Sequence, residues 1–135
     1  MIKIDENRLF EETLKARESS YSPYSNFAVG AVVLLKNGEY IHGTNVENAA
    51  YPSGMCAERI AMFTAYAKGY RKEDILAIAC TGDTKLPISP CAGCRQVMVE
   101  LLDLETPVYL FNLKKDMKVF KVKELVPYLF DKEDL

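Results

Sequence analysis

Three cysteines and one glutamate are the residues of this chain best suited to chemistry. Cys91 and Cys94 form a Cys-x-x-Cys pair, and Cys56 lies upstream of it with Glu58 two positions later. Zinc binds cysteine as the thiolate, and a Cys-x-x-Cys pair at the start of a helix can direct both sulfur atoms at one metal ion. Three protein ligands leave a fourth position open to water, which is typical of a catalytic zinc site rather than a structural one.

Glu58 supplies the second half of this pattern. If Cys56 begins a helix, the carboxylate of Glu58 lies within one turn of the metal without binding it. A carboxylate beside a water on the metal can accept a proton and pass it on. The order Cys-x-Glu followed by Pro-Cys-x-x-Cys is the signature of the zinc deaminases. We therefore predict one catalytic residue, Glu58, and three zinc ligands, namely Cys56, Cys91 and Cys94.

Other uses of the cysteines remain open at this point. The fourth cysteine, Cys80, lies in the apolar run 75–80 and is typical of a small buried side chain. The Cys-x-x-Cys pair alone could be a redox motif, but the upstream cysteine and glutamate would then have no role. A structural zinc site would need a distant fourth ligand, for which His42, the only histidine, is the candidate.

The composition limits the classes of function. The chain has 135 residues, which fits a single catalytic domain over 1–135, and its 17 basic and 19 acidic residues give a formal net charge of −2. The basic residues are scattered, which argues against nucleic-acid binding and favours a small, weakly charged substrate. No apolar run is long enough to span a bilayer, so we expect no membrane association. Four cysteines without a secretory leader indicate the reducing cytoplasm rather than a disulfide framework.

Five segments of the chain are predicted to form strands. They are rich in Val, Ile, Leu, Phe and Tyr, and the first two are joined by an Asn-Gly turn signal at 37–38; the segments are 27–35, 39–43, 75–81, 107–112 and 119–122. Helices alternate with most of these strands. The order predicts the α/β class, as a three-layer α/β/α sandwich with a central mixed five-stranded sheet.

Three longer helices are expected. The first is capped by Asp5 and runs to about Ser19, with Glu12 among its outward residues. The second runs from Cys56 to about Lys68, with Ile60, Phe63 and Ala67 on one face and Gly69 as its stop. The third is capped by Ser89, with Pro90 at its first position. A short helix or tail is expected over 124–130.

The charge of the predicted metal site needs an opposing potential. Zn²⁺ with three thiolates has a net charge of −1, which would oppose the loss of a proton from bound water. The N-termini of the second and third helices would each supply about half a positive charge. Arg59 and Arg95, next to site residues, could donate hydrogen bonds to thiolates, although both could also be surface arginines.

These motifs, taken together, resemble the homotetrameric cytidine deaminases of pyrimidine salvage. The likeness covers nearly the whole chain and is carried by Pro-Tyr-Ser-Asn-Phe at 23–27, Gly-Thr-Asn-Val-Glu-Asn-Ala at 43–49, Cys-Ala-Glu-Arg at 56–59, Ser-Pro-Cys at 89–91, Cys-Arg-Gln at 94–96 and the tail 124–130. Membership would imply that Phe27 packs on the pyrimidine ring. Asn45 and Glu47 would then hold the ribose 3′-hydroxyl.

The resemblance also implies active sites that are shared between subunits of a homotetramer. Ala49 and Tyr51 would reach the 5′-hydroxyl of a nucleoside in a neighbouring subunit, and Phe130 would stack on a base in another. Arg59 would offset thiolate charge, and each subunit would hold one Zn²⁺.

The expected reaction is zinc-dependent hydrolysis of cytidine and 2′-deoxycytidine to uridine and 2′-deoxyuridine, with release of ammonia. One alternative is deamination of a related aminopyrimidine such as blasticidin S. The sugar-binding pair Asn45 and Glu47 favours a nucleoside over it. From another class, the chain could be a non-catalytic binding module stabilised by zinc, but Glu58 beside three thiolates argues for catalysis.

Overall fold

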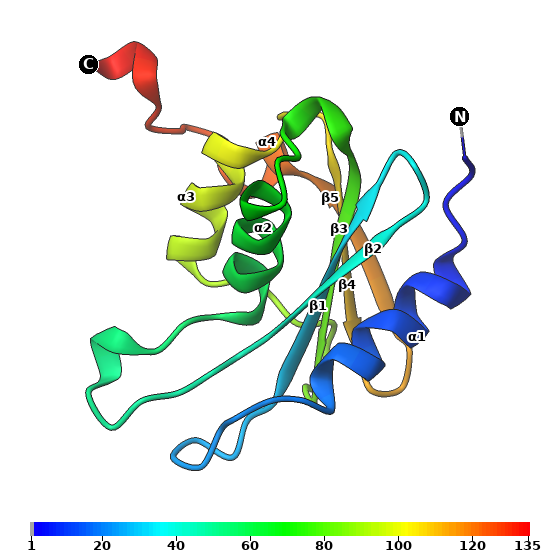
Figure 1. Ribbon diagram of the computed structural model, residues 1–135, viewed down its shortest axis with the longest axis vertical. Helices are drawn as coiled ribbons and strands as arrows, with labels where there is room; N and C mark the ends of the chain where they lie inside the picture. Colours follow the sequence, from blue (N-terminus) through cyan, green and yellow to red (C-terminus); the bar gives the residue numbers. More distant parts are fainter. Residues whose placement is uncertain (1) are drawn as a thin grey trace.

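A computed structural model describes residues 2–135 and places one five-stranded sheet between two layers of helices (Figure 1). The strand order is β2-β1-β3-β4-β5, with bounds β1 (Val29–Leu35), β2 (Tyr40–Thr44), β3 (Ile75–Gly82), β4 (Pro107–Asn112) and β5 (Met117–Lys121). The β3 and β4 strands are parallel, and the other neighbouring pairs are antiparallel. The predicted mixed five-stranded sheet is confirmed.

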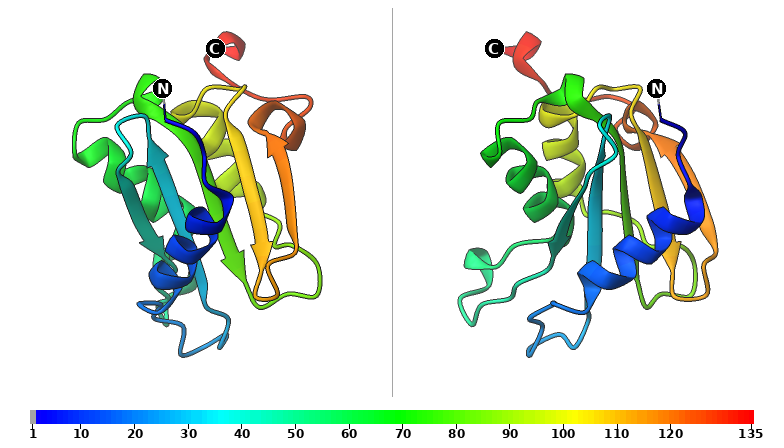
Figure 2. Two further views of the ribbon diagram at one scale, coloured as in Figure 1. Left: turned by 90° about the vertical axis from the view of Figure 1, so that its right-hand side faces the viewer. Right: turned by 45° about the vertical axis from the view of Figure 1, so that its right-hand side comes forward.

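Helices cover both faces of this sheet, as predicted. The α1 helix (Glu6–Arg17) lies on one face, and α2 (Ala57–Ala67) and α3 (Ala92–Leu101) lie on the other, near the short α4 (Val122–Leu125) (Figure 2). Asp5 caps α1 through its side chain, which accepts hydrogen bonds from the backbone of Asn7 and Arg8. The three-layer α/β/α architecture is therefore confirmed.

The central strands are buried on both sides. Successive side chains of a strand point to opposite faces, so β1 divides its apolar residues between two clusters. Val32 and Leu34 belong to the cluster under α1, whereas Val33 and Leu35 belong to the cluster under α2 and α3. Cys80 lies in the second cluster with 1% of its surface exposed, as expected for a core cysteine.

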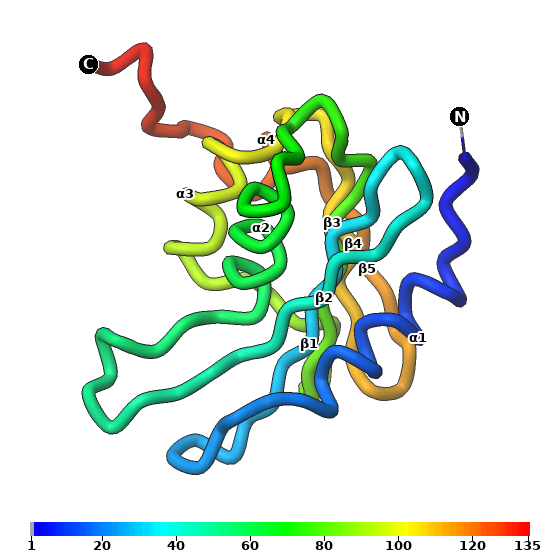
Figure 3. Tube along the Cα trace, viewed as in Figure 1, coloured from blue at the N-terminus to red at the C-terminus, as the bar shows by residue number. Residues whose placement is uncertain are grey.

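Three chain segments meet at one end of the sheet. Val29 at the start of β1 pairs with Gly82 at the end of β3, and Gly30 pairs with Thr44 at the end of β2. The segments 18–28, 45–56 and 83–91 therefore leave the sheet from the same end, and the first two extend well beyond it (Figure 3). Strand register therefore brings the connections that hold the site residues to one end of the sheet.

Glycine at position 43 sets how closely α2 approaches the sheet. A Cβ atom at Gly43 would lie 2.3 Å from the carbonyl oxygen of Ala57 and 2.4 Å from the backbone nitrogen of Ala61. Only a residue without a side chain leaves room for the first turn of α2 against β2. Gly43 thereby determines the distance between the sheet and this turn, which contains Glu58.

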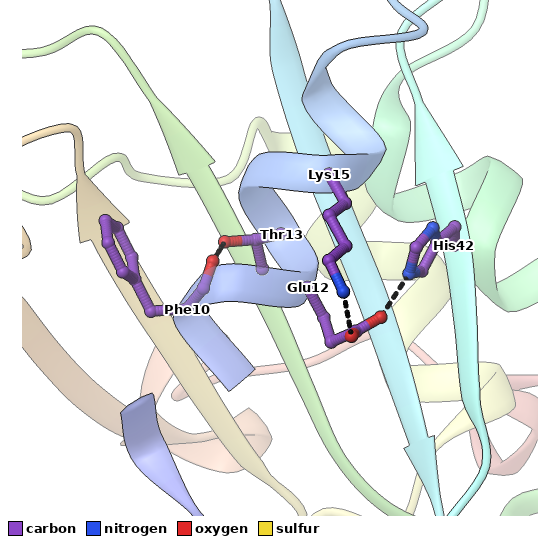
Figure 4. Close-up of polar contacts among 5 residues, drawn as sticks. All are labelled: Phe10, Glu12, Thr13, Lys15 and His42. Carbon is purple, nitrogen blue, oxygen red and sulfur yellow. Dashed lines mark hydrogen bonds and ion pairs between the residues drawn. The ribbon is translucent and has the colours of Figure 1, made fainter. Parts of the chain in front are cut away.

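Glu12 corrects one expectation. It is buried between α1 and β2, where its Oε1 atom lies 2.6 Å from Nε2 of His42 and its Oε2 atom lies 3.2 Å from Nζ of Lys15 (Figure 4). Burial alone would raise the pKa of Glu12, but the hydrogen bonds to His42 and Lys15 outweigh it and lower the pKa. The prediction that Glu12 faces outward is wrong. Its partner His42 lies 30 positions away in the sequence, so the pattern of the helix alone could not indicate the contact.

Several predicted boundaries also move. The first strand starts at Val29, so Phe27 lies in the loop before it, and β5 occupies 117–121 rather than 119–122. The terminal helix begins at Val122 and not at residue 124. On α2 the buried side chains are Ala57, Glu58, Ala61, Met62 and Ala65, so the face that carries Phe63 and Ala67 points away from the sheet.

Candidate active site

The three cysteines predicted as ligands come together at the N-termini of two helices. Cys56 is the N-cap of α2, Cys91 is the N-cap of α3, and Cys94 lies in the first turn of α3. Their sulfur atoms all lie within 4.8 Å of one another, and those of Cys56 and Cys91 are 3.8 Å apart. Such a cluster could hold one metal ion.

The start of α3 differs from the expectation. The helix begins at Ala92 with Cys91 as its cap, so the prediction that Ser89 caps it and Pro90 opens it is wrong. The Sγ atom of Cys91 accepts a hydrogen bond from the backbone nitrogen of Cys94 at 3.4 Å. A sulfur atom thus takes the place of the usual oxygen at the cap, and the metal cluster and the helix start coincide.

The pKa of Cys56 favours a thiolate in the cluster. Hydrogen bonding with Cys94, assisted by Arg59, lowers the pKa of Cys56 to about 5, and the same pair interaction raises the pKa of Cys94. The first thiolate therefore forms at Cys56, and a bound cation would draw the remaining protons from the cluster. Burial raises the pKa of Cys80, which stands outside the cluster as a neutral core residue.

The two arginines next to the cluster behave differently. Arg59 donates from Nη2 to the sulfur of Cys56 at 3.3 Å, a contact through which it would offset thiolate charge. Arg95 donates from Nε to the carbonyl of Pro90 at 2.9 Å and from Nη1 to that of Leu125 at 3.1 Å. The possibility that Arg95 binds a thiolate is therefore wrong, because its guanidinium ties α3 to the C-terminal segment.

His42 lies away from the cluster. It projects from β2 toward α1, on the opposite face of the sheet from α2 and α3, and contacts Glu12. Among residues 2–135, the side chains close enough together to bind one metal ion are the three cysteines, and His42 is not among them. A four-ligand structural site with His42 is inconsistent with this arrangement.

Glu58 lies in the first turn of α2, two residues after Cys56. Its side chain is buried, with 5% of the residue surface exposed, and this burial raises its pKa above the ordinary value. A carboxylate whose pKa is raised is a better proton acceptor than an ordinary carboxylate, and it can pass the proton on. The position beside three thiols is therefore suited to proton transfer.

A pocket of about 440 Å³ opens beside the cluster. Several residues named from the sequence line it, namely Asn45, Glu47, Tyr51, Cys56 and Arg59. Phe27 is outside the lining, but its ring reaches toward Gly82, where a Cβ atom would lie 3.2 Å from Cζ of the ring. Phe27 is also joined to the lining through its carbonyl oxygen, which accepts a hydrogen bond from Nδ2 of Asn45 at 2.8 Å.

Polar residues of the 20–25 segment hold this lining in place. Tyr24 and Ser25 belong to the motif at 23–27, in which only Phe27 was predicted to contact the substrate. Glu47 accepts hydrogen bonds from the backbone nitrogens of Tyr24 and Ser25 at 3.0 and 3.1 Å. Ser20 donates to Oδ1 of Asn45 at 2.5 Å. A strand-like bridge between Tyr21 and Val46 brings the two loops together and makes these contacts possible.

Three predicted substrate contacts lie on exposed segments of the chain. Ala49 and Tyr51 are exposed on the projecting 45–56 loop, where the ring of Tyr51 packs edge-on against Tyr24 with centroids 6.4 Å apart. Phe130 is exposed in the C-terminal segment, and its carbonyl accepts a hydrogen bond from Nε2 of Gln96 at 2.8 Å. Tyr51 still lines the same pocket as Cys56, whereas Ala49 and Phe130 are outside its lining.

Comparison with known proteins decides the family. The family described as the cytidine and deoxycytidylate deaminase zinc-binding region matches residues 3–110. A cytidine deaminase from Halalkalibacterium halodurans is 49% identical over 132 residues, which cover 98% of each chain. The chain belongs to the cytidine deaminase family. The prediction that it is a deaminase, and so a hydrolase, is confirmed.

Solved structures of this family agree with the fold. The crystal structure of a cytidine deaminase from Burkholderia pseudomallei shares 46% identity and superposes with a TM-score of 0.92, over 94% of this chain and 100% of the other. A cytidine deaminase from Mycobacterium tuberculosis gives a TM-score of 0.80 at 32% identity, over 96% and 99% of the two chains. No helix within residues 2–135 has the length and apolar character needed to cross a membrane.

Proposed function

We propose that this member of the cytidine deaminase family hydrolyses cytidine and 2′-deoxycytidine to uridine and 2′-deoxyuridine and releases ammonia. The observation that carries the proposal is the buried carboxylate of Glu58 beside three converging thiols at two helix N-termini. Family membership supports the same reaction.

The donor set fits one zinc ion per chain. Cys56, Cys91 and Cys94 would hold it, and soft thiolates select Zn²⁺ over hard cations such as Mg²⁺. When bound, zinc is a Lewis acid that makes water a nucleophile near neutral pH. Arg59 and the N-termini of α2 and α3 oppose the negative charge of the three thiolates.

Glu58 carries the protons of the reaction. Its carboxylate takes a proton from the attacking water and delivers it to N3 of the cytosine ring, while the water oxygen forms a bond to C4. Glu58 then moves the second proton to the exocyclic amine, and the C4–N bond breaks as ammonia leaves. The buried position excludes bulk water from this exchange.

Residues of the two projecting loops would bind the nucleoside. Phe27 would pack on the pyrimidine ring, and Asn45 and Glu47 would hold the 3′-hydroxyl of the sugar. The hydrogen bond between Asn45 and the carbonyl of Phe27 supports the assignment, because it places sugar-binding and ring-binding residues next to each other.

The charges of the pocket favour nucleosides over nucleotides. Among the described residues that line the pocket, Arg59 is the one with a positive charge, and it already donates a hydrogen bond to the sulfur of Cys56. Glu47 adds a negative charge to the lining. Neither Ala49 nor Tyr51, which would approach the 5′ end, carries a charge. A 5′-phosphate with a charge of about −1.5 to −2 would find no free partner there.

A spectroscopic assay with purified protein tests the reaction and this selectivity. We expect cytidine and 2′-deoxycytidine to lose their cytosine absorbance with stoichiometric release of ammonia, and a zinc chelator to abolish turnover. Because a charge that leaves water without a partner costs several kcal/mol, kcat/KM for cytidine 5′-monophosphate should be lower by about a hundredfold. Failure to convert any cytosine nucleoside would exclude the proposal and direct the search to other aminopyrimidines, then to a binding module.

We also propose a homotetramer with shared active sites in the reducing cytoplasm. The outward face of α2 presents Phe63, and Tyr51, Tyr128 and Phe130 are exposed as well, which is typical of surfaces that bind another chain. Because Ala49 and Phe130 lie outside the pocket lining of their own chain, a neighbour would bring them to a site. The four cysteines are free, as reducing conditions require.

Light scattering coupled to size-exclusion chromatography tests the assembly. The chain has a mass of 15.2 kDa, so we expect a particle of about four times this mass. Replacement of Phe63 by Glu should lower the mass and the turnover together, because the shared sites come apart. A monomeric wild-type protein with full activity would contradict the shared-site proposal.

A further inference from the structure

The hydroxyl of Ser25 links two parts of the substrate pocket. Its Oγ atom donates a hydrogen bond to Oε2 of Glu47 and accepts one from the backbone nitrogen of Phe27 at 3.0 Å. A serine hydroxyl has one donor and two acceptor positions, so one side chain makes both contacts at once. Ser25 therefore connects the residue proposed for the sugar to the residue proposed for the ring.

The carboxylate of Glu47 is almost fully engaged before any substrate arrives. Its Oε1 atom accepts from the backbone nitrogens of Tyr24 and Ser25, and its Oε2 atom accepts from the hydroxyl of Ser25. A carboxylate has about four acceptor positions, so about one is left. Since Glu47 lines the pocket, this position is available to a ligand hydroxyl.

The opposite side of Phe27 is held in a similar way by Asn45. Its Nδ2 atom donates to the carbonyl of Phe27 at 2.8 Å, while its Oδ1 atom accepts from the backbone nitrogen of Val29 at 2.9 Å and from Ser20. Both peptide groups of Phe27 are thus tied to residues of the sugar-binding pair, one directly and one through Ser25.

The contacts matter because Glu47 lies in an exposed loop. A free glutamate at such a position samples many rotamers, and ordering it on binding would weaken substrate affinity. Hydrogen bonds from the side chain and backbone of Ser25, and from the backbone of Tyr24, also lower the pKa of Glu47. Its carboxylate is therefore held both in one place and in the ionised form that accepts a hydrogen bond.

We propose that Ser25 is a positioning residue that orients Glu47 toward the 3′-hydroxyl of the sugar and couples this contact to the backbone of Phe27. The inference rests on the proposed function and adds a residue to it. It requires that the contribution of Ser25 to substrate binding depends on the 3′-hydroxyl, because a substrate without this hydroxyl makes no hydrogen bond with Glu47.

A pair of substrates that differ only in the 3′-hydroxyl tests the proposal. With 2′-deoxycytidine, Ser25→Ala should raise KM about tenfold and change kcat by less than about threefold, because a hydrogen bond to a charged group is lost. With 2′,3′-dideoxycytidine, the same variant should change KM by less than about twofold. Ser25→Thr keeps the hydroxyl and should behave as the wild type on both substrates.

The matched control is Ser19→Ala, since Ser19 is exposed in the turn after α1 and lies outside the pocket lining. Equal losses on both substrates would overturn the proposal, because they indicate a general structural role for Ser25. An unchanged KM for 2′-deoxycytidine would overturn it as well. If the wild type converted neither compound, the proposed function would fail. The pKa of the Glu47 carboxyl group would then test separately whether Ser25 holds this side chain.

That separate measurement is an NMR titration of the Glu47 carboxyl group. The hydroxyl of Ser25 stabilises the ionised form, so Ser25→Ala should raise the pKa of Glu47, while Ser25→Thr should leave it as in the wild type. The same pKa in Ser25→Ala and in the wild type would show that Ser25 does not hold the carboxylate.

Discussion

Replacement of Glu58 by Gln should lower kcat for cytidine at least about a thousandfold, which corresponds to about 4 kcal/mol in the transition state. Gln has the shape of Glu but cannot take a proton from water, and every proton transfer of the proposed reaction passes through this side chain. Zinc should remain bound at one ion per chain, because the amide replaces a group outside the three cysteines.

The measurement combines steady-state kinetics with metal analysis of the same preparation. Glu58 is buried, so the loss of its charge removes a desolvation cost and should not lower the melting temperature. Glu100→Gln is the matched control, because Glu100 is exposed on α3. A zinc-loaded Glu58→Gln protein with kcat near that of the wild type would exclude the role of Glu58 in proton transfer.

The cysteine cluster could be predicted because its signal is local. Cys91 and Cys94 are three positions apart, and Cys56 precedes Glu58 by two, so secondary structure alone nearly fixes their relation. The order of strands and helices was predictable for a similar reason, since each segment has its own apolar pattern. These local patterns could not predict that the starts of α2 and α3 lie side by side. The register of the strands determines that arrangement.

The details that escaped prediction depend on partners that are distant in the sequence. Glu12 is buried because His42 faces it across the α1–β2 contact, and no pattern within α1 indicates that. Small alanines, rather than Phe63, face the sheet on α2 because Gly43 lies beneath them. The role of Ser25 likewise exists only because Glu47, 22 positions later, folds back onto its loop.

Helix propensity and spacing could not locate the start of α3 either. Ser89 and Pro90 are favoured residues for a cap and a first turn, yet the helix starts two residues later, at Ala92. The sulfur of Cys91 accepts the hydrogen bond that a serine oxygen would otherwise accept. A functional group has therefore displaced the local preference, as is expected at a site where chemistry rather than stability determines the residue.

Replacement of Cys94 by Ala should abolish zinc binding and turnover together. Cys94 is one of three sulfur donors within 4.8 Å, and two remaining thiolates cannot complete a catalytic site that needs three protein ligands. Since bound zinc stabilises the folded form, the melting temperature should fall as well. Zinc analysis, the cytidine assay and thermal unfolding of one preparation measure all three effects.

Cys80→Ala separates the loss of metal from the loss of packing. Cys80 and Cys94 are both buried, with 1% and 0% of their surfaces exposed, so their replacement by Ala creates cavities of similar size. Cys80→Ala should lose some stability but keep its zinc and its activity. Added zinc should restore turnover to chelator-treated wild type and not to Cys94→Ala. Normal zinc content in Cys94→Ala, or loss of zinc in Cys80→Ala, would contradict the assignment of ligands, because the two residues differ chiefly in whether their sulfur belongs to the cluster.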